Sequence, residues 1–274
     1  LTPRTEDDHN RVSETKQNWF NYSYELFGNY DFSLNDEHNF NVFAGFTIGK
    51  GTNNMLSGSN VDVPFNSWTY ADLSSAAGGM EDQSTGSWQS VNRSVSLMGR
   101  VEYDFQEKYL ASVTVRRDGS TSFGKNNKFA VFPSASIGWV ASNEDFFNSS
   151  AINFLKFRAS YGTVGNDNAS PQFGTISTFP KYTFGETIYS GSTLLGIPNN
   201  DVSWENQTQT NIGVDLRMFD SKLSFTADYF IKSVDDLLFS PTLSLYLGIP
   251  AYPVANIGKT ETKGYELSLS YGDE

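Results

Sequence analysis

Strict alternation of apolar and polar residues is the dominant pattern of this chain. At residues 94–103, "SVSLMGRVEY", Val95, Leu97, Val101 and Tyr103 fall on one face, and polar side chains dominate the other. A period of two residues predicts a β-strand with two different faces. The pattern predicts nine strands, at 19–34, 38–49, 94–103, 108–118, 128–141, 152–163, 206–218, 222–233 and 262–271. Helical spacing is absent apart from at most one turn within 142–150.

The expected strands are long. Strands of soluble sandwiches have about 5–6 residues. The segments predicted here have roughly ten to fifteen, which matches tilted strands that cross a membrane with about 9–11 residues. Strand length therefore favours a large transmembrane barrel.

The connections alternate between short and long. Tight turns are expected at 35–37, 105–107 and 220–222, and long polar connections at 50–92, 164–205 and 234–261. Transmembrane barrels have short turns on one side and long loops on the other. A soluble sandwich has no physical reason to sort its loops in this way.

Aromatic residues gather near the tight turns. Tyr103, Phe105 and Tyr109 surround one of these turns, and Phe219 precedes another. Such rings either form the interfacial girdle of a membrane barrel or cap a soluble core. Pro133 counts against a strand at 128–141, because it lacks a ladder hydrogen bond, unless it lies at a bulge or near the strand start.

Charge and composition exclude several classes of function. The 274 residues include 31 acidic and 19 basic side chains, a net charge of −12, which argues against a nucleic-acid partner. There is no cysteine, and the two histidines are far apart, so neither a thiolate nor a zinc site is expected. Acidic loops offer oxygen ligands for calcium, but the EF-hand spacing is absent, so no cofactor is predicted.

Catalysis is not expected. The adjacent carboxylates Glu144-Asp145 and Asp235-Asp236 point to opposite sides of a strand or lie in turns, whereas catalytic pairs need a shared pocket. The glycine-rich stretches "GKNN" and "GTVGN" do not open a helix, so they do not cradle phosphate. We therefore predict a protein that is not an enzyme.

Membrane helices and a signal peptide are both absent from the given sequence. The opening "LTPRTEDDHNRVSETKQ" is polar, and no apolar run approaches the roughly 20 residues of a membrane helix. A hydropathy average would indicate a soluble protein. Barrel strands escape that average, because their residues alternate.

One segment resembles a known family. Residues 116–139, "RRDGSTSFGKNNKFAVFPSASIGW", resemble a stretch that recurs in SusC/RagA-like TonB-dependent outer-membrane transporters. The residues that carry the resemblance are Arg117, Asp118, Gly119, Ser120, Phe123, Gly124, Phe132, Pro133, Ser134 and Trp139. Four later segments follow in the family's order, namely "SYGTVGN", "WENQTQTNIGVD", "DYFIKSVDDLL" and "NIGKTETKGYELSL".

The resemblance implies a fold, a location and partners. It implies a 22-stranded barrel in the outer membrane of a Gram-negative bacterium, closed by an N-terminal plug. It implies active import of oligosaccharides or peptides, powered through a TonB box, with a SusD-like surface lipoprotein as lid and a dimer of transporter–lid pairs. Neither plug nor TonB box is found here. Residues 1–274 are therefore expected to form a section of about nine strands of the all-β, antiparallel barrel.

Candidate contact residues lie on the polar strand faces and in the long loops. Polar-face residues are expected to wet the lumen and pair with plug residues; they are Arg100, Glu102, Arg158, Asp215, Arg217, Asp228 and Lys232. Loop aromatics either stack on substrate sugars, anchor the lid or pack within their own loops. The candidates are Trp68, Tyr70, Trp88, Tyr182, Tyr189, Trp204, Tyr246 and Tyr252. The apolar segment 240–253 is the best candidate for packing against the lid or other loops.

Three other readings remain open at this point. A passive porin-like channel would use the same strands. A secreted sugar-binding sandwich would pack Leu223, Phe225 and Tyr229 against a second sheet. An outer-membrane enzyme would need a convergent set of acid, base or nucleophile, which the sequence does not offer.

Overall fold

The nine predicted strands are all present in one antiparallel sheet. A computed structural model describes residues 9–65, 67–168, 176–177, 181–191, 193–194, 199–241, 244, 246 and 254–272. The strands hydrogen-bond in the order β1-β2-β3-β4-β5-β6-β11-β12-β15. Their bounds are β1 Arg11–Leu34, β2 His38–Val61, β3 Ser84–Phe105, β4 Tyr109–Ser120, β5 Phe129–Val140, β6 Ile152–Asn166, β11 Glu205–Met218, β12 Leu223–Asp235 and β15 Lys259–Tyr271.

Minor elements lie in the connections. Short 3-10 turns in the described part of the chain include η1 Trp68–Tyr70, η2 Leu73–Ser75 and η3 Ala141–Asn143. Three two-stranded pairs are β7 Ile176–Ser177 with β10 Thr193–Leu194, β8 Lys181–Phe184 with β9 Thr187–Ser190, and β13 Leu238–Phe239 with β14 Ala255–Asn256. Among the described residues, no helix is long and apolar enough to span a membrane.

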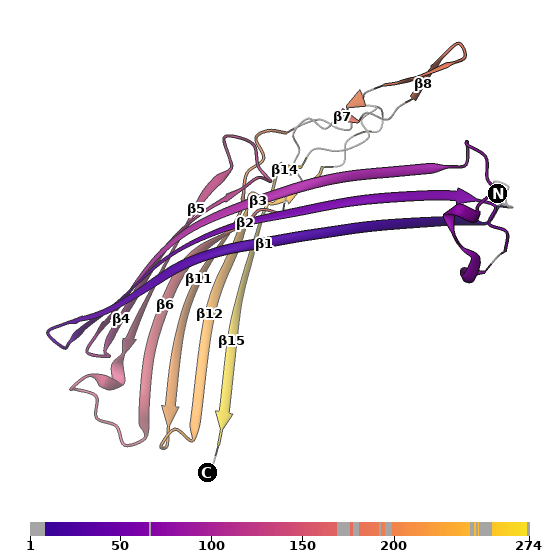
Figure 1. The fold of residues 1–274 in the computed structure, drawn as a ribbon. Helices are drawn as coiled ribbons and strands as arrows, with labels where there is room; N and C mark the ends of the chain where they lie inside the picture. Colours follow the sequence, from indigo (N-terminus) through magenta and orange to yellow (C-terminus); the bar gives the residue numbers. More distant parts are fainter. Residues whose placement is uncertain are drawn as a thin grey trace. The chain divides into compact units, whose positions relative to one another are not determined.

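The chain divides into two units, and strands β1, β2 and β3 contribute residues to both. Unit 1 comprises residues 1–23 and 49–93, and unit 2 comprises 24–48 and 94–274. In unit 2, strands β4, β5, β6, β11, β12 and β15 lie side by side, and the described chain ends at the tip of β15 (Figure 1).

The tight turns of unit 2 hold residues in the left-handed backbone region. Asn35 and Asp36 have φ values of 53° and 57°, and Gln106 and Glu107 have 50° and 53°. Two successive positive φ values are the mark of a type I′ hairpin turn, whose twist matches that of the flanking strands. The third predicted tight turn, at Phe219–Ser221, has three such residues. The predicted alternation of short and long connections holds only in part. The connection between Val140 and Ile152 lies on the tight-turn side but is longer than the one between Ser120 and Phe129 on the opposite side.

Pro133 lies within β5 at a position where its missing N–H does no harm. The β4–β5 ladder runs past it, with Val115 opposite Pro133. The β5–β6 ladder begins one residue later, at Ser134 opposite Gly162. The carbonyl of Pro133 accepts a 3.1 Å hydrogen bond from Thr163 Oγ1 of β6. Pro133 thus lies just before the β5–β6 ladder begins, so its missing N–H does not interrupt the hydrogen bonds of that ladder.

The predicted loop at 50–92 is wrong in its extent. Strand β2 continues to Val61 and β3 begins at Ser84, so the connection spans only 62–83. Strands β1 and β2 each have 24 residues and β3 has 22, at least twice the roughly 9–11 that cross a membrane. The extra residues are rich in Gly, Asn and Ser and lack apolar alternation, so the pattern gave no strand signal.

A small apolar core forms between the long connections of unit 2. Phe123, Phe132, Val202 and Trp204 are all buried and pack together, with Phe123 only 1% exposed. The Phe123 and Trp204 ring centroids are 5.0 Å apart. These residues come from the β4–β5 and β6–β11 connections and from β5, so the core joins segments distant in sequence.

Candidate functional site

The sheet of unit 2 has one apolar and one polar face. Val113 of β4 lies opposite Val101 of β3 and Ala135 of β5, and the same register continues through the neighbouring strands. On this apolar face the large side chains are exposed: Leu97, Val113, Val131, Ile137, Ile212, Tyr265, Leu267 and Leu269 range from 53% to 79%. Soluble proteins rarely expose so continuous an apolar surface. A bilayer is the solvent that suits it.

The apolar face ends in charged residues toward the long loops. On β15 it includes Tyr271, Leu269, Leu267 and Tyr265. Further along the same side of the sheet, Lys263 pairs with Glu261 at 2.9 Å, and Lys259 pairs with Asp235 of β12 at 2.8 Å. Tyrosines at both ends of an apolar band are typical of membrane interfaces.

Glu144 binds aromatic side chains at the end of the sheet that carries the tight turns; we call it the short-turn end. Its Oε1 accepts hydrogen bonds from Tyr109 Oη at 2.6 Å and from Trp139 Nε1 at 2.9 Å. Lys108 Nζ lies 3.7 Å from Glu144 Oε2. The Tyr109 hydroxyl, and then the Trp139 indole and the Lys108 ammonium, hold the pKa of Glu144 below its usual value. The polar atoms of Tyr109 and Trp139 are therefore hydrogen-bonded at the end of the sheet where the lipid headgroups are expected.

The polar face centres on Arg158 of β6. Its Nε lies 3.1 Å from Asp215 Oδ2 of β11, and its Nη2 lies 2.7 Å from Asp228 Oδ2 of β12. Thr226 donates to the other oxygen of Asp215 at 3.2 Å. The guanidinium crosses β11 at Gly213, where a Cβ would lie 2.8 Å from Arg158 Cζ. Glycine at this position gives the long side chain its route to the next strand.

Hydroxyl and carboxamide groups continue this face toward the long loops. Asn211 Nδ2 donates to Ser160 Oγ at 3.2 Å, and Gln209 Nε2 donates to Asn211 Oδ1 at 2.9 Å. In register with Ser160 lie Ser136 of β5 and then Ser112 of β4. Such groups can both donate and accept hydrogen bonds, and they suit water or a polar solute.

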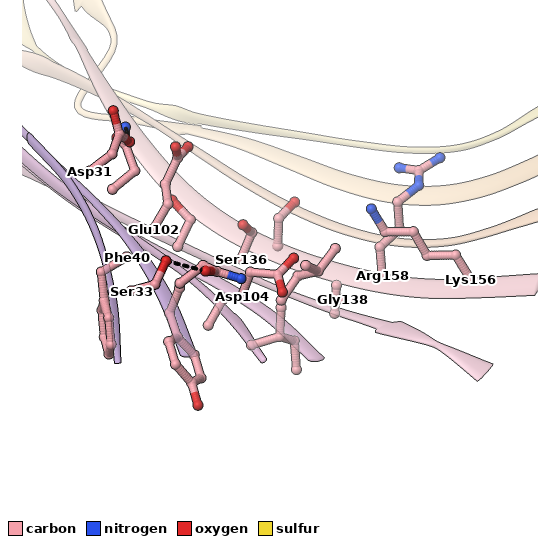
Figure 2. Close-up of a pocket in the computed structure, with 18 of the residues that line it drawn as sticks. Asp31, Ser33, Phe40, Glu102, Asp104, Ser136, Gly138, Lys156 and Arg158 are labelled. Atoms are coloured by element: carbon pink, nitrogen blue, oxygen red, sulfur yellow. Dashed lines mark hydrogen bonds between the residues drawn. The ribbon is translucent and has the colours of Figure 1, made fainter. Parts of the chain in front are cut away.

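A hollow of about 700 Å³ lies along this part of the sheet (Figure 2). Its lining includes Asp31, Glu102 and Asp104 from β1 and β3, and Lys156 and Arg158 from β6. In Figure 2 the carboxylates of Asp31 and Glu102 rise from the same side of the sheet as Arg158, while the ring of Phe40 points to the other side. The wall therefore offers separate anionic and cationic regions on one polar surface.

The structure brings together three of the seven predicted polar-face residues. Arg158, Asp215 and Asp228 form the ion-pair cluster described above. Arg100 approaches Glu102 at 3.4 Å and lies over the Phe43 ring, and Arg217 lies over the Phe154 ring at 4.9 Å. Sequence reasoning missed Asp31 and Lys156, although their parity within alternating strands was a usable signal for the same face.

The predicted aromatic residues of unit 1 are exposed. Trp68 in η1 is 96% exposed, and Trp88 in β3 is 42% exposed. Tyr70 is 53% exposed and packs its ring 4.9 Å from that of Phe65. Trp88 therefore belongs to a strand, although its segment was expected to be a loop.

The predicted aromatic residues of unit 2 differ in placement. Trp204 is buried at 7% exposure, so the loop-packing alternative describes it and it offers no ring to a ligand or lid. Tyr189 of β9 is 53% exposed and meets the Phe184 ring edge-on, and Tyr182 is its backbone partner on β8. Tyr246 is fully exposed. Tyr252, with much of the segment 240–253, lies outside the described residues.

Comparison with known proteins identifies the family to which this two-faced sheet belongs. The family model described as "TonB dependent receptor-like, beta-barrel" matches residues 2–272. The chain belongs to this family. The fold expectation, a section of an antiparallel transmembrane barrel, is confirmed, and so is the resemblance to SusC/RagA-like transporters.

Two curated relatives illustrate the likeness. TonB-dependent receptor P3 of Formosa agariphila is 35% identical over 236 residues, which cover 85% of this chain and 23% of that protein. TonB-dependent receptor SusC of Bacteroides thetaiotaomicron is 31% identical over 186 residues, which cover 65% of this chain and 18% of that protein. The chain thus spans about a fifth of the length of these relatives.

Solved structures share the fold. The RagAB peptide transporter superposes with a TM-score of 0.84 over 94% of this chain and 28% of that chain, at 24% identity. The RagAB peptide importer in its "open-open" state gives a TM-score of 0.80. The alternative hypothesis of a sandwich required Leu223, Phe225 and Tyr229 to pack against a second sheet. The described residues contain no second large sheet, and Tyr229 packs against Tyr265 of its own sheet.

Proposed function

We propose that this chain forms part of the barrel wall of a TonB-dependent transporter in the outer membrane of a Gram-negative bacterium. The transporter imports oligosaccharides or peptides too large for ordinary porins. The observation that carries the proposal is the division of the sheet into an exposed apolar face and a polar face that bears the Arg158 cluster. Membership of the TonB-dependent receptor family supports active transport as the function to which this wall contributes.

The wall has the chemistry of a solute path. Its groups are paired carboxylates and guanidinium, hydroxyls and carboxamides, which solvate a passing polar solute without reacting with it. A SusD-like surface lipoprotein acts as the lid over the long connections, and an inner-membrane TonB complex supplies the energy. Relatives named SusC and RagAB support these partners.

The test uses the full-length protein in its native outer membrane. Uptake of radiolabelled oligosaccharides and peptides is measured in cells with and without TonB, and again after a protonophore collapses the inner-membrane potential. Uptake that disappears in both cases supports active import. Uptake that persists without TonB identifies a passive channel. Extraction in mild detergent, followed by the intact mass of each subunit, checks for the lipoprotein.

A further inference from the structure

Three strands of unit 1 share a face whose centre is Gly51. A Cβ on Gly51 would lie 2.6 Å from Asn21 Oδ1 and 3.7 Å from Asn92 Nδ2, so these residues of β2, β1 and β3 face the same way. Side chains alternate along a strand, so every second residue from these three shares the face. We name it the uncharged face; its residues are Ser13, Thr15, Gln17, Trp19, Asn21, Gly51, Asn53, Met55, Ser57, Ser59, Ser84, Gly86, Trp88, Ser90 and Asn92.

Charge is sorted between the two faces of this part of the sheet. Glu14, Lys16, Lys50 and Arg93 all have the opposite parity and lie on the other face. Arg11, the first residue of β1, is the exception at the strand end. Exposed strand faces ordinarily carry charged side chains. A face of fifteen residues without a charge is therefore unusual on a chain of net charge −12.

Two tryptophans stand on the uncharged face. Trp19 is 63% exposed and Trp88 is 42% exposed. Counting from Asn21, Gly51 and Asn92, Trp19 lies beside Asn53, and Trp88 lies two strands away and one row further along. Their Cα atoms are therefore about 12 Å apart, from strand spacings of about 4.8 Å and residue spacings of about 3.4 Å.

Carboxamides surround these rings. Gln17 Nε2 donates to Asn53 Oδ1 at 3.2 Å, which uses one donor and one acceptor of the pair. Each carboxamide has two donor hydrogens and an acceptor oxygen, so further capacity remains on both. The connection after β2 packs on the other face, where Leu73 Cδ1 lies 3.2 Å from the Cβ position of Gly58. This contact leaves the uncharged face accessible.

We propose that the uncharged face of unit 1 binds a neutral oligosaccharide chain. Trp19 and Trp88 stack on the apolar faces of two sugar rings, and Gln17, Asn53 and Asn92 hydrogen-bond the hydroxyls at the ring edges. Sugar hydroxyls both donate and accept, as carboxamides do. An acidic polysaccharide or a peptide with charged termini would place ionised groups on a surface that offers no counter-charge. The inference rests on the proposed function and deepens it by naming a substrate class.

The test is equilibrium binding to the full-length purified protein in detergent. The probes are maltohexaose, cellohexaose, laminarihexaose and xylohexaose, with oligogalacturonate and a peptide library as charged competitors. Isothermal titration calorimetry is expected to detect at least one neutral probe. Trp19→Ala and Trp88→Ala should each weaken its affinity about tenfold. Trp19→Phe should retain more of the affinity, because a stacking ring remains.

The matched control is Phe20→Ala, one residue away on the other face, where the side chain is 66% exposed. It should leave affinity unchanged, and so should a change from low to high salt, because no charge is involved. The inference is overturned if no neutral probe binds, if both tryptophan variants bind like the wild type, or if charged probes bind more tightly.

Binding and transport separate the two proposals. Equilibrium binding needs no TonB, so normal TonB-dependent uptake with unaffected tryptophan variants overturns the binding face and leaves the transporter intact. Tryptophan-dependent binding without any TonB-dependent uptake supports the binding face and overturns the proposed transport function.

Discussion

Arg158 reaches Asp228 across an intervening strand, and Gly213 gives it passage. The 2.7 Å bond from Arg158 Nη2 to Asp228 Oδ2 links β6 to β12, with β11 between them. A guanidinium binds both carboxylates of this cluster because its fork presents several N–H donors in one plane. The cluster fixes three neighbouring strands on the polar face of the wall.

Gly213→Ala is expected to destabilise the folded barrel by about 1–3 kcal/mol, the usual cost of overpacking. The new Cβ would meet Asp228 Oδ1 and lie 2.8 Å from Arg158 Cζ, so the guanidinium has to move. Urea unfolding in detergent measures the loss. The control is Gly99→Ala, where a Cβ meets nothing within 4 Å. Equal stability of the two variants would contradict the crossing role of Gly213.

A positive charge on the apolar face should destabilise the protein far more than the same charge on the adjacent residue, which lies on the polar face. Val113→Arg is expected to destabilise the protein by about 2–4 kcal/mol in a lipid bilayer, because a cation then faces hydrocarbon. Val113 is 53% exposed there. Ser112→Arg is the matched control, since Ser112 lies on the polar face opposite Glu102. Unfolding in phospholipid vesicles compares the two, and similar losses would argue against a lipid-facing Val113.

Much of the sheet could be predicted, because a bilayer imposes a strong alternation on each strand. The segments around Val101, Ile212 and Leu267 alternate, and the structure places each of them in a strand of the predicted order. The outer parts of β1, β2 and β3 could not be predicted in this way. There, apolar and polar residues do not alternate, and the carboxamides of Gln17 and Asn53 form a hydrogen bond on one face in place of apolar contacts.

Glu144 is expected to make the short-turn end sensitive to acid. Its pKa is lowered in the folded protein, mainly by the hydrogen bond from Tyr109. The ionised form is therefore favoured by folding, so its stabilisation is complete above the ordinary glutamate pKa and is lost as the pH falls through the lowered one. Stability is measured by urea unfolding across the acid range. Glu144→Gln should remove this part of the pH dependence, and an unchanged acid profile would contradict the assignment.

The candidate site could be predicted only in part, because residue type does not reveal which loops meet. Arg158, Asp215 and Asp228 follow from strand parity, and the structure unites them. Trp204 has the composition of a contact residue, yet it is buried against Phe123 from a connection some 80 residues earlier in the chain. Such a contact depends on loop conformations that no local pattern specifies.

Phe123→Ala is expected to loosen the long connections of unit 2 while leaving the barrel wall folded. Phe123 is 1% exposed within the core that includes Phe132, Val202 and Trp204, and deletion of a buried phenylalanine side chain ordinarily costs about 3–5 kcal/mol. Local opening should then expose the adjoining Lys125 and Lys128 to trypsin, and their cleavage should accelerate at least about tenfold.

Two measurements separate local from global effects of Phe123→Ala. Cleavage sites are identified by mass spectrometry, and the folded barrel is followed by its resistance to urea. Phe146→Ala serves as the control, because that ring is 73% exposed in the β5–β6 connection. It should change neither the tryptic cleavage nor the resistance to urea. A Phe123→Ala protein whose lysines remain resistant would show that Phe123 does not hold these connections together. Cleavage confined to the connections, with unchanged resistance to urea, would show that the core stabilises them independently of the wall.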